Sequence, residues 1–369
     1  MKKWFVVMLL ALSVGLYSQE YFLINNGITV YPSSDGDLTH LLFLTGCPES
    51  NEYQDIYKLD CSSNGKWNKR SIQENDNSYL ELGLDENALA KYTGDFYVGY
   101  SFVQSPKEID IDFSDWKDSY GQWKDVPEYD TEAQLYKDNT KQSGDLVVPN
   151  NETIKMLSDE LWEEVGGINV MAYAERCYYY VAQNYRYLNP NTGLHPLSEL
   201  LANGGGDCGN LSSIYISLLR AKGIPARHVI AVGANDNFHV WSEFYVQDRG
   251  WIPVDVTYKN GNPQGNYFGK YHEKFIVVQK GVVMDYRLLW VGNVNIGLLQ
   301  GYYWWYWYKN PVNVSVEMSI TSQMVNYTDV VNVETNETDH PVARKYIIDG
   351  QLVIRYGEHW YNAMGVIVR

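Results

Sequence analysis

The sequence predicts an α+β protein in which helices and a small antiparallel sheet lie between two β-rich regions. Three observations predict this class. Strand-like runs separated by turn residues fill positions 20–115, helical periodicity begins near Thr153, and the apolar pattern changes from period 3.6 to period 2 at Pro225. The expected parts are a signal peptide at 1–18, a sandwich-like β domain at 19–115, a polar connector at 116–150, an α+β domain at 151–300 and a C-terminal β region at 301–369.

The β domain is expected from apolar runs of strand length. Residues 41–44 and 96–103 are short apolar runs between turn clusters, which is typical of buried strands. Residues 109–113 alternate apolar and acidic side chains, a pattern typical of a half-buried strand. Several short strands joined by turns indicate an antiparallel sandwich.

The α+β domain is expected to have helices first and strands afterwards. Apolar residues spaced three and four apart predict a helix that starts near Thr153, and Asn169 can cap a second one. Gly223-Ile224-Pro225 ends the last strong helix. The expected elements are helices at about 153–165, 169–185, 197–202 and 208–222, followed by strands at 227–233, 238–246 and 251–256.

The C-terminal β region contains seven consecutive aromatic residues at 302–308. Two interpretations are open: a strand packed between two domains, or a platform on which sugars stack. Further on, Asp349-Gly350 separates two β-rich triplets, which predicts a hairpin.

Composition restricts the class of partner. The 369 residues are 45% hydrophobic and 20% charged, which excludes wholesale disorder. The formal net charge is −16, so the chain would repel a phosphate backbone and nucleic-acid binding is disfavoured.

The N-terminus indicates export. Two lysines precede an apolar run that reaches Tyr17, which is typical of a signal peptide, and cleavage is expected after Ser18. The alternative is a retained anchor helix. We expect a bacterial protein of the periplasm, cell surface or medium, with no stable membrane span once the signal is removed.

Export affects how the cysteines are interpreted. Cys47 and Cys61 lie in a polar stretch and could pair in an oxidising compartment, and two free thiols are the alternative. Cys177 lies on a helical pattern and is expected in the core. Cys208 differs, because it follows three glycines at a helix start.

The position of Cys208 favours nucleophilic chemistry. A helix N-terminus carries partial positive charge, which stabilises a thiolate, and its free N–H groups can hold an oxyanion. A thiol nucleophile needs a base, and the base needs an orienting group. His239 lies on the second expected strand and Asp255 on the third, so antiparallel pairing can bring the two together. His228 is a less favoured alternative base, expected to be an ordinary strand residue.

Four stretches in this order resemble the transglutaminase-like superfamily of papain-like thiol enzymes. They are Gly206–Gly209, the run from Leu218 to Arg227 that includes Gly-Ile-Pro-Ala-Arg, His239–Glu243 and Gly250–Asp255. The resemblance covers about residues 170–260. It implies a Cys208-His239-Asp255 triad on a helix and small sheet, and acyl transfer from an amide to water or an amine. For the further oxyanion donor of the family, the upstream candidates are Gln183, Asn184, Tyr185 and Tyr187.

The expected activity is that of an exported cysteine peptidase or amidase acting on protein or peptide amides through a thioester. The alternatives are a cross-linking transglutaminase and a non-catalytic module that binds glycan or protein at the cell surface. No metal or cofactor is expected, because paired Cys-x-x-Cys and His-x-x-x-His motifs are absent from the sequence. The segment from Ala343 to Gly365 resembles the C-terminal sorting tails of type IX secretion, and a plain pair of terminal hairpins is the alternative.

Overall fold

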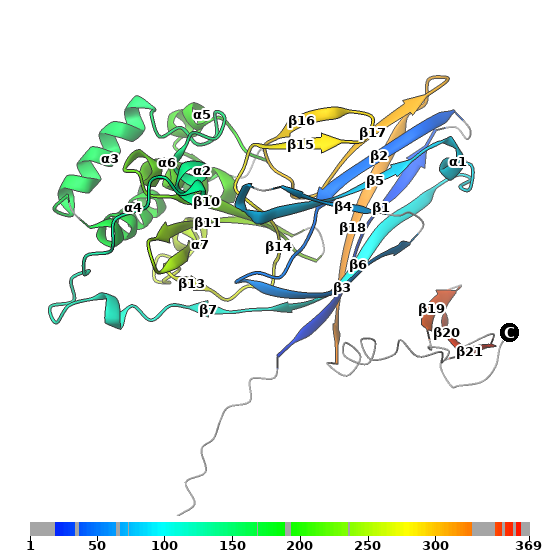
Figure 1. Ribbon diagram of the computed structural model, residues 1–369, viewed down its shortest axis with the longest axis horizontal. Coiled ribbons are helices and arrows are strands. Elements are labelled where there is room, and N and C mark those ends of the chain that lie inside the picture. The colour runs from blue at the N-terminus through cyan, green and yellow to red at the C-terminus, as the bar shows by residue number, and fades with distance from the viewer. Residues whose placement is uncertain are drawn as a thin grey trace, which may run out of the picture. The chain divides into compact units, whose positions relative to one another are not determined.

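The computed structural model describes residues 19–33, 37–63, 67–72, 74–167, 169–188, 193–234 and 237–326, together with strands at 344–348, 351–356 and 359–362. The expected signal peptide lies outside these residues. The chain forms two compact units, 1–324 and 325–369. The α+β class is confirmed: helices with a small antiparallel sheet stand beside strand-rich sheets (Figure 1).

The first unit contains a sandwich of two four-stranded sheets, ordered β18-β1-β6-β3 and β17-β2-β5-β4. Alternate side chains of both sheets, such as Ile28, Phe43 and Val98, fill the core between them. A short helix, α1 (Glu86–Leu89), lies between β5 and β6. The strands are β1 (Tyr21–Pro32), β2 (Leu38–Gly46), β3 (Gln54–Ser63), β4 (Asn68–Ile72), β5 (Asn77–Leu84), β6 (Phe96–Pro106), β17 (Tyr302–Tyr308) and β18 (Val314–Val325).

The sandwich is completed by residues from far along the chain. Strand β18 lies beside β1, and β17 pairs antiparallel with β2, with Trp304 opposite Phe43. The segment that the sequence places in a separate C-terminal β region therefore starts with two outer strands of the N-terminal sandwich. An outer strand pairs with one neighbour only, so a segment from late in the chain can add to the edge of a sheet that earlier segments form.

The aromatic run at 302–308 is a strand, as one of the two interpretations predicts, but it is an edge strand of the sandwich. Trp304 and Tyr306 pack against the sandwich core. Trp305 and Trp307 pack on the opposite face, against a cluster that includes the hairpin β15 (Met284–Leu288) and β16 (Gly292–Ile296). Because side chains pack on both faces of β17, aromatic residues follow one another without alternation, although Tyr303 and Tyr308 stay exposed.

The α+β part has the helices that the sequence predicts, within one or two residues at most ends. They are α3 (Glu152–Glu164), α4 (Val170–Asn184), α5 (Leu197–Asn203) and α6 (Cys208–Ala221), preceded by α2 (Gln134–Thr140) in the connector. Side chains of Asn151, Asn169 and Asp207 cap α3, α4 and α6 by accepting a backbone N–H of the first turn. Helix α6 is buried along most of its length.

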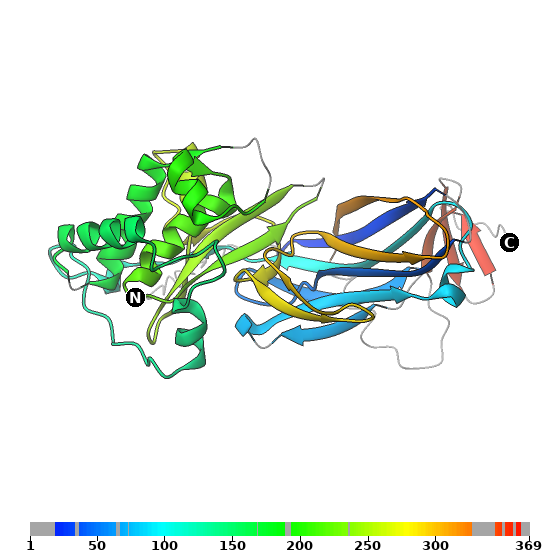
Figure 2. The ribbon, with the colours of Figure 1, turned by 90° about the horizontal axis from the view of Figure 1, so that it is seen from above.

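A four-stranded antiparallel sheet, called the α+β sheet below, lies under these helices in the order β12-β11-β10-β14 (Figure 2). Its strands are β10 (Ala226–Val232), β11 (Phe238–Val246), β12 (Gly250–Val254) and β14 (Ile276–Lys280). Helix α6 packs against β10 and β11. The first two strands confirm the prediction closely, whereas the third ends before Asp255.

Amide side chains of the sandwich hold the outer edge of the α+β sheet. Gln54 donates from Nε2 to the Val277 carbonyl at 2.9 Å and accepts the Val277 N–H at 3.0 Å. Gln104 donates to the Phe275 carbonyl at 2.9 Å. Because both glutamines are buried, these bonds satisfy an edge strand that would otherwise need another partner.

The second unit contains β19 (Arg344–Ile348), β20 (Gln351–Tyr356) and β21 (His359–Asn362), in one antiparallel sheet. Tyr346 pairs with Val353, which confirms the predicted hairpin, although Asp349-Gly350 lies outside the described residues. Within the described part of the chain, none of the helices is long and apolar enough to cross a membrane.

Candidate functional site

Cys208 is the first residue of α6 and is partly exposed. Asp207 caps the helix by accepting the Asn210 N–H at 3.1 Å. The preceding strand β9 (Gly205–Gly206) pairs in parallel with β8 (Arg186–Tyr187). A Cβ atom on Gly205, whose φ is +147°, would lie 2.0 Å from the Arg186 carbonyl oxygen, so this close approach requires glycine. The glycine-rich run thus fixes the helix end that presents the sulfur.

His239 and Asp255 form a close, buried pair. His239 Nε2 lies 2.6 Å from Asp255 Oδ2. Asp255 follows β12 directly and is the N-cap of α7 (Val256–Gly261), where its other oxygen accepts the Tyr258 N–H at 2.9 Å. The sequence places Asp255 inside a strand; the helix cap ends the strand one residue earlier. With both oxygens engaged, the carboxylate holds one orientation and leaves His239 Nδ1 as the nitrogen available to a thiol.

Aromatic rings surround the His239 imidazole. The Tyr258 ring stacks on it at a centroid distance of 4.7 Å and an angle of 12°. Phe275 lies 5.4 Å away, and Trp241, two residues along β11, lies 5.9 Å away in a nearly parallel plane. These contacts restrict rotation of the imidazole and exclude water from its faces.

The charges around His239 favour its protonated form. Burial alone would lower the imidazole pKa, but the Asp255 carboxylate and the Cys208 sulfur, which adds a hydrogen bond, raise this pKa to about 10. An imidazolium that faces a sulfur at a helix N-terminus stabilises a thiolate. The three predicted residues are therefore brought together in an arrangement suited to nucleophilic attack.

Of the four upstream candidates for an oxyanion donor, Tyr187 pairs with Gly206 in the strand that leads to Cys208, and its side chain is exposed. Partial burial and the negative charges of Cys208 and Asp207 raise the pKa of the Tyr187 hydroxyl, so it remains a hydrogen-bond donor. Tyr185 is buried, and Asn184 donates to the Tyr180 carbonyl on its own helix. Gln183 is exposed.

His228 is a strand residue, as the sequence predicts. It has no exposed surface, and its Nε2 lies 3.0 Å from Ser213 Oγ and 3.3 Å from the Gly209 carbonyl oxygen. Burial and the nearby Arg220 guanidinium lower its pKa to about 3. His228 supports the first turns of α6 from below and stays neutral.

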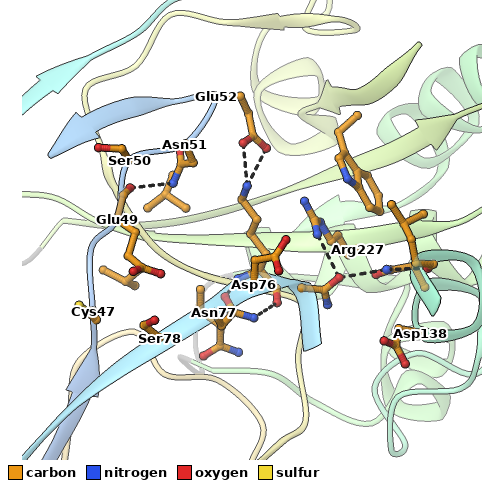
Figure 3. Close-up of a pocket in the computed structure, with 18 of the residues that line it drawn as sticks. Cys47, Glu49, Ser50, Asn51, Glu52, Asp76, Asn77, Ser78, Asp138 and Arg227 are labelled. Carbon is orange, nitrogen blue, oxygen red and sulfur yellow. Dashed lines mark hydrogen bonds and ion pairs between the residues drawn. The ribbon is translucent and has the colours of Figure 1, made fainter. Parts of the chain in front are cut away.

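A polar cavity of about 790 Å³ lies between the sandwich and the edge of the α+β sheet (Figure 3). Cys208, His239 and Asp255 are not among the residues that line it. Its wall includes Arg227, Trp251 and the ion pair of Lys280 with both oxygens of Glu52. A cavity of about 310 Å³ adjoins the glycine turn before Cys208 and is lined by Leu188, Gly206 and Asn210, among others. A further cavity of about 30 Å³ is lined by Asp255 itself, together with Tyr258 and Trp241 among others.

Besides Cys208, the described cysteine side chains are those of Cys47 and Cys177, and both are buried. Cys47 is buried, but the Cys61 side chain lies outside the described residues, so their pairing stays a prediction. Cys177 is buried, as predicted, and burial raises its pKa to about 12. Within the described ranges, no group of three or more His, Cys, Asp or Glu side chains is placed to hold a metal ion.

Helices on a small antiparallel sheet, with a cysteine at a helix N-terminus beside a His–Asp pair, define a papain-like α+β domain. The family model of the transglutaminase-like superfamily matches residues 161–256, and this part of the chain is a transglutaminase-like domain. The resemblance inferred from the sequence motifs is thereby confirmed. None of the curated proteins matches the chain.

Several solved structures are similar in outline. A candidate cysteine protease from Cytophaga hutchinsonii shares 15% identity over 84% of this chain and 93% of its own, with a TM-score of 0.48. A candidate protease from Parabacteroides distasonis shares 9% over 61% and 44%, with a TM-score of 0.27. Legionella pneumophila LapG shares 18% over 36% and 90%, with a TM-score of 0.25.

Proposed function

We propose that the protein is an exported thiol hydrolase that cleaves amide bonds of proteins or peptides. The observation that carries this proposal is the 2.6 Å contact between His239 and Asp255, on an imidazole that interacts with the Cys208 sulfur at the start of α6. Cys208 is the nucleophile, His239 the general base and acid, and Asp255 the group that orients the imidazole.

In the first half of the reaction, the Cys208 thiolate attacks the amide carbonyl carbon. The carbonyl oxygen becomes an oxyanion, which the backbone N–H groups of the first turn of α6 can stabilise, with the Tyr187 hydroxyl as a further donor. The C–N bond then breaks, and the leaving nitrogen takes the proton from His239. An amine departs and a thioester remains on Cys208.

In the second half, neutral His239 removes a proton from a water molecule, whose oxygen attacks the thioester carbon. The C–S bond breaks, a carboxylic acid leaves, and the thiolate beside protonated His239 is restored. An amine in place of water would give a cross-linked product instead. We favour water because it is always present, whereas amine transfer needs a shaped acceptor site that excludes water.

The assignment to an exported, bacterial setting rests on the N-terminal sequence, with its basic start and apolar run. Polypeptides are favoured as substrates because acyl transfer from an amide is the chemistry that the superfamily resemblance implies. A polypeptide would reach the partly exposed Cys208 from solvent.

The test compares two cysteines of one chain. We expect iodoacetamide to label wild-type protein at mildly acidic pH, Cys208→Ala to lose this labelling and Cys177→Ala to keep it, because Cys177 is buried and protonated. Mass spectrometry of a peptide library then distinguishes cleavage, deamidation and cross-linking by their mass changes. Equal labelling of Cys208→Ala and wild type, or an unchanged library, would contradict the proposal.

A further inference from the structure

We propose that Tyr53, a residue of the N-terminal β domain, positions the His239 imidazole through Trp241, so that the β domain completes the active site. This inference rests on the proposed thiol chemistry. It gives the sandwich a role in the reaction, since one of its side chains would set the geometry of the general base.

Tyr53 is inserted into the α+β part from a tight turn just before β3. Its N–H donates to Asn51 Oδ1 and its carbonyl accepts the Lys107 N–H, both at 2.8 Å. The side chain has no exposed surface and belongs to a separate apolar cluster made otherwise of α+β residues. Two backbone anchors in the sandwich therefore hold a ring that is buried in the neighbouring part. The other buried members of this cluster are Val229, Ala231, Trp241, Tyr271, Phe275 and Val277.

The Tyr53 ring is in contact with the residue that stacks toward His239. Tyr53 meets Trp241 edge-on at a centroid distance of 5.2 Å, and it meets Tyr271 edge-on at 4.9 Å. Tyr271 also stacks on Trp241 at 4.8 Å. Tyr53 and Tyr271 thus both hold the Trp241 ring, and this ring, nearly parallel to the imidazole, limits the positions that the imidazole can take.

The Tyr53 hydroxyl fixes the same strand at a second point. It donates to Glu243 Oε2 at 2.6 Å, and the other oxygen of Glu243 accepts from Arg227 Nε at 2.6 Å. Glu243 has no exposed surface, so its charge depends on these partners. His239, Trp241 and Glu243 are every second residue of β11 and therefore lie on the same face of the strand. Tyr53 contacts this face twice, with its ring at Trp241 and with its hydroxyl at Glu243.

The far end of this network is also rigid. The Arg227 guanidinium lies 3.8 Å from the centroid of the Trp251 ring and donates to Asn75 Oδ1 at 3.0 Å, at the wall of the polar cavity (Figure 3). Burial and the Glu243 charge raise the pKa of Tyr53 well above its usual value, so its hydroxyl remains a donor at any working pH. Residues of both parts hold His239 in this way, and catalytic geometry tolerates displacements of only about 0.5 Å.

The experiment compares Tyr53 with Tyr79, a matched control in the sandwich. Tyr79 is buried, meets Tyr286 edge-on at 5.2 Å and donates to the Arg287 carbonyl at 3.0 Å, but it has no contact with the His239 network. For the Tyr53→Ala and Tyr79→Ala variants, we measure thermal stability, kcat and KM on a cleaved peptide, and the pH profile of Cys208 alkylation.

We expect both variants to lose stability, but only Tyr53→Ala to lose kcat, on the order of tenfold to hundredfold with KM little changed, and to shift the alkylation profile. Tyr53→Phe, which keeps the ring, should restore most of kcat. If Tyr53→Ala does not fold, Tyr53→Leu takes its place. A folded variant with the wild-type profile and kcat would overturn the inference. A wild-type protein without Cys208 reactivity would instead overturn the proposed function, which keeps the two failures distinct.

Discussion

Two buried histidines on neighbouring strands of the α+β sheet differ in the charge that they carry. His239 on β11 and His228 on β10 are both almost fully buried, yet the pKa of His239 is raised to about 10 and that of His228 is lowered to about 3. Burial acts in the same direction on both, because it penalises the charged imidazole. The partners therefore decide the outcome.

The partners of the two histidines differ in charge. His239 faces a carboxylate and a sulfur, both of which favour a positive ring. His228 faces a hydroxyl, a carbonyl oxygen and the Arg220 guanidinium, and its Nδ1 makes no hydrogen bond to any described residue. One histidine is thus suited to proton transfer at the start of α6, and the other supports the same helix as a neutral residue.

The same substitution at both positions separates these roles. We expect His239→Gln to reduce peptide cleavage and Cys208 alkylation at pH 6 by about 10²–10⁴-fold, because the general base and the imidazolium charge are lost. The protein should still fold, since the glutamine amide can donate to Asp255. The measurement is activity per folded molecule, and a variant with wild-type activity would exclude His239 as the base.

His228→Gln should act on stability and leave the chemistry in place. The buried hydrogen bonds to Ser213 and Gly209 would be remade imperfectly, so we expect a loss of about 1–3 kcal/mol in the free energy of unfolding at pH 8. Denaturant titration checks the loss, and alkylation of the folded variant checks the chemistry. If alkylation fell as far as in His239→Gln, the distinction between the two histidines would disappear.

Much of the site can be predicted from the sequence, because its signals are local. The glycines before Cys208 and the apolar stripe of α6 identify a buried helix with a nucleophile at its start. The alternating runs around His239 identify a strand. Asp255 is predicted as the partner of His239, but on the third strand; the structure places it one residue after that strand, as the N-cap of α7.

The remainder depends on contacts between distant residues, which have no local signal. Tyr53 lies 190 positions from Glu243 in the chain, and the sequence shows only a tyrosine in a polar turn. The pairing of β17 with β2 also joins distant residues, and the aromatic pattern of β17 does not indicate which strand lies beside it. The sequence offers four candidates for the oxyanion donor and does not choose among them. Tyr187 is favoured only by the pairing of β8 with β9, which sets it opposite Gly206.

The last expected effect is the pH dependence of stability that His228 adds. Its folded pKa of about 3 lies below the unfolded value of ~6.5, so between these pH values the unfolded chain binds a proton that the folded chain does not. The contribution is complete above pH ~6.5 and is lost as the pH falls towards 3, with a slope of at most about 1.4 kcal/mol per pH unit.

Carboxylates add their own acid dependence, but mainly below pH ~5 and equally in wild type and His228→Gln. The difference between the two unfolding curves from pH 5 to pH 7 therefore isolates the histidine, and the wild type should lose more stability than the variant over this range. Parallel curves would mean that His228 is protonated in the folded state. In that case its neutral environment, and with it the contrast with His239, would be wrong.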